Sequence, residues 1–253
     1  MLIGYCEIEK AEPFQNTRMS VNPELYKEII TELKRKNVTL VAVSKTKPVE
    51  EILELYDLGQ RDFGENYVQE LVEKEAQLPK DIRWHFIGHL QSNKVKLIAP
   101  FVSLIHSVDS DKILKEINKQ AAKNNRVIDC LLQVYIASEE TKFGLDKEEL
   151  SSLIKTIGFN GSQDKMLYKN VCIKGLMGMA SFTDDKEILR NEFKVLKSIF
   201  DKYADMSSAN CQLSIVSMGM SADYRMAIEE GSNMVRIGSL LFGERVYSSK
   251  GNN

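Results

Sequence analysis

The chain has 253 residues, of which 43% are hydrophobic and 28% are charged, and its formal net charge is -2. This composition is typical of a folded globular protein with a large core, and it argues against a general nucleic-acid-binding or anionic-membrane surface. No run of about 18 apolar residues could cross a membrane, and the acidic N-terminal stretch lacks the apolar core of a signal peptide. We therefore expect a cytoplasmic protein.

The four cysteines, Cys6, Cys130, Cys172 and Cys211, are scattered along the chain without CxxC spacing. This pattern predicts buried thiols and argues against both disulfides and metal ligands. His85 and His89 are four residues apart, but they lie in a strand-like segment without an HExxH glutamate, so we expect no zinc site.

In chain order, residues 1–20 are interpreted as an N-terminal extension, and residues 22–37 are predicted to form a helix with Asn22 as its N-cap and Pro23 in its first turn. Short β-rich runs then alternate with amphipathic segments of helical spacing. Eight strands are predicted at residues 38–45, 61–66, 83–88, 102–109, 129–136, 170–180, 211–219 and 233–243. Further helices are predicted at residues 48–59, 111–123, 146–158, 184–204 and 221–231.

Eight strands alternating with helices imply right-handed crossovers between parallel strands, and a barrel closes at this number and chain length. We therefore predict an α/β fold with a single (β/α)8 barrel of the TIM type over residues 21–248, including an extra N-terminal helix. Residues 249–253 are interpreted as a flexible tail. A doubly wound open sheet is the structural alternative.

Two lysines follow the first predicted strand, in "TLVAVSKTKP". Active groups in such barrels lie at the C-terminal ends of the strands, and side chains two apart on a strand point the same way. Lys45 and Lys47 are therefore expected to lean over the barrel mouth, where a second ammonium and partial desolvation favour the neutral amine that forms a Schiff base. Two lysines that simply cap an exposed strand end are the plainer interpretation, and these residues alone favour it.

Glycines and serines follow the seventh and eighth predicted strands, in "SMGMSADY" and "VRIGSLLFG". The corresponding loops of such barrels often bind phosphate through backbone N–H groups, so Gly219, Ser221, Gly238 and Ser239 are candidate phosphate ligands. Arg236 lies inside an apolar strand, where it needs a polar partner if it is buried. An arginine that faces a pyridine nitrogen is one known cofactor arrangement.

Six segments together resemble the pyridoxal-phosphate homeostasis protein family: "VAVSKTKP", "GQRDFGENYVQE", "WHFIGHLQSNK", "GMSADY", "EGSNMVRIGSLLFGER" and "YSSK". They occur in order between about residue 38 and residue 250. The resemblance implies a fold like the barrel domain of alanine racemase, which is fold type III of the enzymes that use pyridoxal 5'-phosphate (PLP). It also implies that Lys45 carries PLP as an internal aldimine, with Lys47 as its neighbour.

The resemblance assigns further cofactor contacts. It implies that Arg236 faces the pyridine nitrogen and that Asn66 of "GEN" lies near the ring. The residues expected at the phosphate are Ser217, Ser221, Gly238 and Ser239, and Gly219, Met220 and Lys47 are further cofactor-binding candidates. The chain departs from the family at Tyr135, where an asparagine is expected, and an aromatic side chain there could pack beside the cofactor or block part of its pocket. The loop at residues 158–170 is also longer than usual.

Three functions follow from these residues. The first is a PLP-binding protein of intracellular PLP homeostasis that turns over no amino acid, acts as a monomer and passes PLP to apo-enzymes. The second is a PLP-dependent racemase, and the third is a Schiff-base lyase acting on a sugar phosphate. A racemase needs bases on both faces of its substrate, and the racemase-like relatives take one base from a second domain that this chain has no residues left to build. An arginine at the pyridine nitrogen also makes the ring a poorer electron sink, so we expect a binding protein without robust catalysis.

Overall fold

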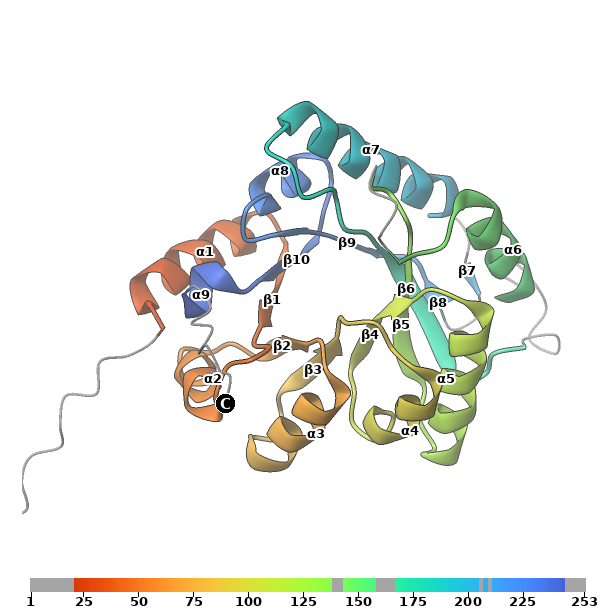
Figure 1. The fold of residues 1–253 in the computed structure, drawn as a ribbon, viewed down its shortest axis with the longest axis horizontal. Helices are drawn as coiled ribbons and strands as arrows, with labels where there is room; N and C mark the ends of the chain where they lie inside the picture. The colour runs from red at the N-terminus through yellow and green to blue at the C-terminus, as the bar shows by residue number, and fades with distance from the viewer. Residues whose placement is uncertain (1–20, 138–142, 158–166, 205–206, 209–210, 244–253) are drawn as a thin grey trace, which may run out of the picture.

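The computed structural model describes residues 21–137, 143–157, 167–204, 207–208 and 211–243. Eight parallel strands form a closed barrel in the order β1-β10-β9-β6-β5-β4-β3-β2, and helices surround it (Figure 1). The structure therefore confirms the predicted single (β/α)8 barrel and rules out the open sheet. The predicted extension at residues 1–20, the tail at residues 249–253 and the segment "YSSK" lie outside the described residues.

The barrel strands are short, and each pairs in parallel with both of its neighbours. Their bounds are β1 (Thr39–Val43), β2 (Asp62–Glu65), β3 (Arg83–Phe86), β4 (Leu104–Val108), β5 (Ile128–Gln133), β6 (Val171–Met177), β9 (Ile215–Met220) and β10 (Met234–Ile237). In the register of the first strand, Val41 lies opposite Arg236 on β10, and Val43 lies opposite Gly64 on β2. The first strand is therefore flanked by the strand that carries the predicted cofactor arginine.

The helices form the outer layer of the barrel (Figure 1). Their bounds are α1 (Pro23–Arg35), α2 (Val49–Asp57), α3 (Val68–Gln77), α4 (Val95–Ile98), α5 (Asp111–Lys123), α6 (Lys147–Ile157), α7 (Lys186–Tyr203), α8 (Tyr224–Glu229) and α9 (Ser239–Phe242), with a 3-10 turn η1 (Ser92–Lys94) before α4. The side chain of Asn22 accepts a hydrogen bond from the N–H of Leu25 at 3.1 Å, which confirms the predicted N-cap of α1. Helix α3 was not predicted.

Two predicted strands differ from the structure near the C-terminus. The segment predicted as one strand at residues 211–219 is divided: β8 (Cys211–Gln212) pairs antiparallel with β7 (Ser207–Ser208), and the barrel strand β9 begins only at Ile215. The apolar residues after Gly238 form the short helix α9 and do not extend the last strand. A short apolar run fits either element by its pattern alone, so the sequence could not separate them.

The core has two layers. The larger layer lies between the strands and the helices and contains fully buried side chains such as Phe63 and Phe193. The smaller cluster consists of barrel-strand residues whose side chains fill the interior: Val41, Leu104, Leu131, Met177 and Met234. The barrel interior is therefore a packed core with no open pore, and any polar side chain inside it needs a partner.

Two cysteines show different states. Cys130 is a free thiol on β5, and burial raises its pKa, so it is inert, as expected. Cys172 is disulfide-bonded in the structure, which corrects the expectation that all four cysteines are thiols. Among the helices described, none combines the length and the apolar character needed to cross a membrane.

Candidate functional site

The predicted site residues lie at the C-terminal ends of four neighbouring strands, β9, β10, β1 and β2. Gly238, after β10, lies against Val43 at the end of β1, because a Cβ on this glycine would be 3.2 Å from the Val43 carbonyl oxygen. The hydroxyl oxygen of Ser221, after β9, accepts a hydrogen bond from the N–H of Gly238 at 3.2 Å. The two candidate phosphate loops therefore touch each other and the strand that leads to Lys45.

Lys45 lies in a tight turn directly after β1 and is half-buried. The turn closes through a 3.0 Å hydrogen bond from the N–H of Lys47 to the carbonyl of Ser44, and Thr46 adopts a positive φ of 63°. Such a backbone conformation is unfavourable for a β-branched residue and persists only where its surroundings hold it. Here the N–H of Thr46 donates to Glu70 on α3 at 2.6 Å, so contacts outside the barrel fix the position of Lys45.

A buried ion pair under this turn was not predicted from the sequence. The ammonium of Lys74 on α3 donates to Glu65 at 2.7 Å, to Glu70 at 2.6 Å and to the Ser44 carbonyl at 2.7 Å. The hydroxyl of Ser44 also donates to Glu65, at 2.7 Å. Burial raises the pKa of Glu65, and the charge of Lys74 only partly offsets this effect. The residues on both sides of Lys45 are thus tied to one buried charge cluster.

The side chain of Lys47 contacts helices α9 and α2. Its ammonium donates to the carbonyl of Phe242 in α9 at 2.6 Å and lies 3.2 Å from a carboxylate oxygen of Glu51. The expectation that both lysines lie on one strand is wrong, because β1 ends at Val43 and both follow it in the turn. That they lean over the barrel mouth stays a prediction. Lys47 connects the Lys45 turn to the helix that follows the last strand, and its role as a cofactor contact stays a prediction.

Arg236 on β10 is buried in the barrel interior. Its guanidinium donates to the carbonyl and hydroxyl of Ser217 at 2.9 and 2.6 Å and to the carbonyl of Gly178 at 3.0 Å. Burial lowers the pKa of Arg236 to about 10, an effect that the charge of Asp223 partly offsets. None of the described carboxylates forms an ion pair with this buried cation, and its N–H donors are not all used by these three contacts.

The two candidate phosphate loops differ in the backbone N–H donors that they leave free for a ligand. Gly219 has a φ of +94°, and a Cβ there would lie 2.6 Å from the Cβ of Ala227, so the turn requires glycine. The N–H of Met220 is bound by Asp223 at 2.5 Å, so this predicted contact has no backbone donor to spare. In the described part of the chain, the N–H groups of Ser239 and Leu240 have no acceptor, as expected for the first turn of a helix.

Asn66 follows β2 on the other side of β1. Its side-chain oxygen is buried and has no hydrogen-bond partner within the described structure. Its backbone is held close to the next strand, since a Cβ on Gly88 would lie 2.1 Å from the Asn66 carbonyl oxygen. A buried amide oxygen of this kind, at the C-terminal end of a barrel strand, offers an acceptor to a ligand with a hydrogen-bond donor.

Tyr135, the main departure from the family pattern, lies just beyond β5 and is half-buried. Its N–H donates to the carbonyl of Leu145 at 3.0 Å, and Gly144 passes so close that a Cβ there would lie 2.6 Å from the Tyr135 nitrogen. The backbone at Tyr135 is therefore fixed. Residues 138–142 and most of the loop predicted to be long, residues 158–166, lie outside the described residues.

A group of polar side chains inside the barrel was not predicted from the sequence. His85 on β3 and His106 on β4 are buried, and their ring nitrogens Nδ1 and Nε2 lie 2.9 Å apart. Their only signal was a polar residue at an inward position on two consecutive strands. Across the described ranges, no group of three or more His, Cys, Asp or Glu side chains is arranged to hold a metal ion.

Comparison with known proteins places the chain in a family. A profile described as "Alanine racemase, N-terminal domain" matches residues 25–246. A protein of Aquifex aeolicus named pyridoxal phosphate homeostasis protein is 43% identical over 209 residues, which cover 82% of this chain and 87% of the relative. The human protein of the same name is 40% identical, with 83% and 78% covered. The chain belongs to the pyridoxal phosphate homeostasis protein family.

Solved structures agree with this assignment. PipY of Synechococcus elongatus PCC7942, solved with PLP bound, is 32% identical, covers 87% of this chain and 99% of its own, and superimposes with a TM-score of 0.77. Alanine racemase of Streptomyces coelicolor A3(2) has a TM-score of 0.66 at 12% identity, with 87% of this chain and 58% of the racemase covered. This second likeness shows the shared barrel fold alone. Membership of the homeostasis protein family and the barrel fold are therefore both as predicted.

Proposed function

We propose that this chain binds PLP at the C-terminal end of its barrel and acts in PLP homeostasis without turning over an amino acid. The observation that carries the proposal is Arg236, a buried cation with N–H donors to spare and no ion-paired carboxylate among the described residues. A buried charge of this kind is costly unless a ligand compensates it. The names of the relatives and the PLP bound to PipY support PLP as that ligand.

The residues present fit PLP in three respects. Arg236 offers donors to a pyridine nitrogen. The N–H groups of Ser239 and Leu240, which have no acceptor among the described residues and lie next to Gly238 and Ser221, suit a phosphate group, since glycine admits an anion close to the backbone. The buried side-chain oxygen of Asn66, on the opposite side of Lys45, is an acceptor without a hydrogen-bond partner in the described ranges.

Bound PLP would supply an aldehyde, which condenses with a primary amine to form a Schiff base and release water. We assign that amine to Lys45, because its turn is held by contacts with Glu70 and Lys74 and so presents the side chain from a fixed backbone. Arg236 would donate to the ring nitrogen and keep it unprotonated, which weakens the electron sink that carbanion chemistry requires. The same contact favours binding over catalysis.

Several further features belong to this proposal. Transfer of PLP to apo-enzymes, a monomeric state and a cytoplasmic location remain predictions from the sequence. Ser217 would act through its hydrogen bonds to Arg236, because its hydroxyl already contacts that guanidinium. Lys47 would act indirectly as well, by holding α9 and hence the loop at Ser239.

Reduction with borohydride tests the assignment of the amine. The purified protein loaded with PLP should absorb as a Schiff base, and reduction should fix the cofactor on the peptide that contains Lys45. Lys45→Ala should abolish this absorption, whereas the control Lys47→Ala should keep it and lower only the affinity for PLP. A reduced adduct found on Lys47 alone, or an unchanged spectrum in Lys45→Ala, would contradict the proposal.

A second experiment tests the absence of turnover. The PLP-loaded protein is incubated with alanine, serine and lysine in deuterated water, and α-hydrogen exchange is followed by NMR. We expect no steady exchange, and we expect PLP to pass to an added apo-enzyme whose activity reports the transfer. Exchange that continues over many turnovers and disappears in Lys45→Ala would show a racemase-like enzyme.

A further inference from the structure

A row of hydrogen-bonded side chains crosses the barrel interior and ends at Arg236. The guanidinium lies 2.6 Å from the hydroxyl of Ser217 on β9, and this hydroxyl lies 3.3 Å from Nδ1 of His106 on β4. Nε2 of His106 lies 2.9 Å from Nδ1 of His85 on β3, and Nε2 of His85 lies 3.0 Å from Asp62 on β2. Because β9 and β4 are not neighbours in the barrel, the contact of Ser217 with His106 spans the lumen.

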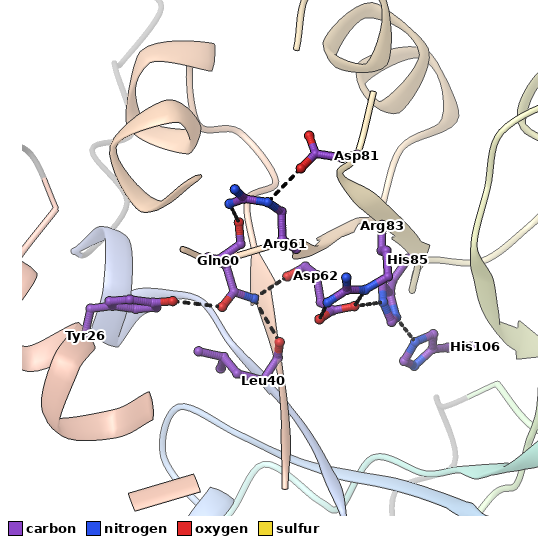
Figure 2. A network of polar contacts seen from close by, with 9 residues as sticks. All are labelled: Tyr26, Leu40, Gln60, Arg61, Asp62, Asp81, Arg83, His85 and His106. Carbon is purple, nitrogen blue, oxygen red and sulfur yellow. Dashed lines mark hydrogen bonds and ion pairs between the residues drawn. The ribbon is translucent and has the colours of Figure 1, made fainter. Parts of the chain in front are cut away.

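The far end of this row is held by several contacts near the N-terminal ends of the strands. Figure 2 shows Arg83 beside Asp62, where Nε and Nη2 of Arg83 lie 2.7 and 2.5 Å from the two carboxylate oxygens. The side-chain amide of Gln60 donates to the Asp62 carbonyl at 2.7 Å and accepts from Tyr26 of α1 at 3.2 Å. Asp62 is thus a fixed group, about as far from the barrel mouth as its strand allows.

The proton positions along the row follow from its two ends. A guanidinium can only donate hydrogen bonds. Burial raises the pKa of Asp62, but the hydrogen bonds from His85 and Arg83 outweigh it and hold the pKa at about 2, so the carboxylate can only accept. Burial lowers the pKa of His106 well below its ordinary value, with smaller contributions from His85 and Arg236, so this ring is neutral.

For the case in which each ring carries one proton, only one arrangement satisfies every contact. Nε2–H of His85 donates to Asp62, which leaves Nδ1 of His85 as an acceptor for Nε2–H of His106. Nδ1 of His106 then accepts from the Ser217 hydroxyl, whose oxygen accepts from Arg236. Any other placement of the two ring protons leaves a bare nitrogen facing an acceptor, or two N–H groups facing each other.

We propose that Asp62 is a positioning residue for Arg236: it fixes both histidines as Nε2–H tautomers, and it thereby turns the lone pairs of Ser217 toward the guanidinium. All the dipoles in the row point the same way, with their negative ends toward the cation. The row therefore stabilises the buried positive charge of Arg236 from a distance, as a directly paired carboxylate does for most buried arginines. The proposed effect on PLP rests on the proposed function, whereas the tautomers do not depend on PLP.

Ring 15N NMR tests this assignment directly, because a protonated ring nitrogen and a bare one differ widely in chemical shift. The chain has three histidines, so His89→Gln leaves only His85 and His106 to assign. In the wild-type protein, both rings should show a protonated Nε2 and a bare Nδ1 at pH 7.5. A protonated Nδ1 on His106 would overturn the proposal.

Asp62→Ala removes the acceptor and should change the proton pattern of both rings. It should also raise the dissociation constant for PLP about three- to tenfold, the effect of one good hydrogen bond. Asp81→Ala is the matched control, since Asp81 binds Arg61 and Tyr56 on the same side of the barrel without contacting either histidine (Figure 2). The proposal is wrong if Asp62→Ala leaves His106 unchanged, or if PLP binds this variant and the wild-type protein equally well.

Ser217→Ala provides a second test if Asp62→Ala fails to fold. This variant removes the donor to Nδ1 of His106 and should shift that nitrogen, while His85 keeps its protonated Nε2 because Asp62 still fixes it. A change of tautomer at His85 would show that the row is ordered from the arginine end and would overturn the role of Asp62. A wild-type protein that binds no PLP would refute the proposed function, and the ring spectra alone would then decide the role of Asp62.

Discussion

Replacing Lys74 by methionine tests whether the buried charge cluster holds the Lys45 turn. Methionine keeps the length of the side chain but removes the ammonium that contacts Glu65, Glu70 and the Ser44 carbonyl. Glu65 is fully buried, so without Lys74 it must take up a proton to remain inside. We therefore expect Lys74→Met to make the free energy of unfolding depend on pH in a defined way.

The size of the effect follows from linkage. The ordinary pKa of Glu65 is 4.5, so keeping it protonated at pH 7 spans about 2.5 pH units, and at about 1.36 kcal/mol for each unit the loss is at most about 3 kcal/mol. The difference from the wild-type protein is smaller than this, because the wild-type pKa of Glu65 is itself raised. The folded-state pKa of this group lies above the unfolded value. The protonated carboxyl group therefore contributes stability at low pH, and this contribution is lost as the pH rises. In the wild-type protein, burial already raises the pKa of Glu65 although Lys74 is beside it. The free energies of unfolding of the variant and the wild-type protein therefore diverge only above that raised pKa.

Urea unfolding of the PLP-free proteins at several pH values between 5 and 8 measures this separation, with the single tryptophan, buried Trp84, as the fluorescent probe. The double variant Glu65→Gln with Lys74→Met has no charge to neutralise and should lose the pH dependence. The reasoning is refuted if the difference between Lys74→Met and the wild-type protein stays constant over this pH range. Lys74→Met should also retain PLP less well, because Ser44 and the backbone of the Lys45 turn lose their anchor.

Three further predictions concern the interior and the loops. Arg236→Met should leave the PLP-free protein as stable as the wild type or more stable, because it removes a buried cation, while PLP binding weakens at least tenfold; a clear loss of stability in urea would contradict this. Gly219→Ala should lower stability by about 1–3 kcal/mol in thermal unfolding, because φ is +94° and the new Cβ would lie 2.6 Å from that of Ala227; an unchanged melting temperature would refute the strain. Asp62, with a pKa held at about 2, should contribute about 2 kcal/mol that is lost as the pH falls from about 4 to about 2; the unfolding curves of Asp62→Asn and the wild type should therefore converge in acid, and parallel curves would show no such contribution.

The architecture could be predicted from the sequence because it depends on local patterns. Each signal depends only on residues close by in the chain: the eight apolar runs, the N-cap at Asn22 and the proline before α2. The alternation of strands and helices then determines the barrel. The end of β1 could not be predicted as well, because Thr46 takes its positive φ from a hydrogen bond to Glu70, 24 residues away. The place of Lys45 and Lys47, in a turn and not on the strand, was misjudged for that reason.

The parts of the site that escaped prediction are pairs of polar residues far apart in the chain. Lys74 has the pattern of a solvent-exposed lysine on an amphipathic helix, and only the fold brings it to Glu65, which points outward from β2. His106 meets Ser217 across 111 residues and across the lumen. A polar residue at an inward position is visible in a sequence, but its partner is determined by the shear of the barrel.

The barrel wall separates two tasks that the proposed function requires. Outside the wall, Lys74 and its carboxylates hold the backbone on both sides of Lys45, so they determine where the amine lies. Inside the wall, the row from Asp62 to Arg236 determines where the buried positive charge lies. The two sets share no side chain, so a change in one should leave the other intact. A protein that must bind a cofactor firmly and still release it could then change the position of the lysine amine and the strength of the buried positive charge independently.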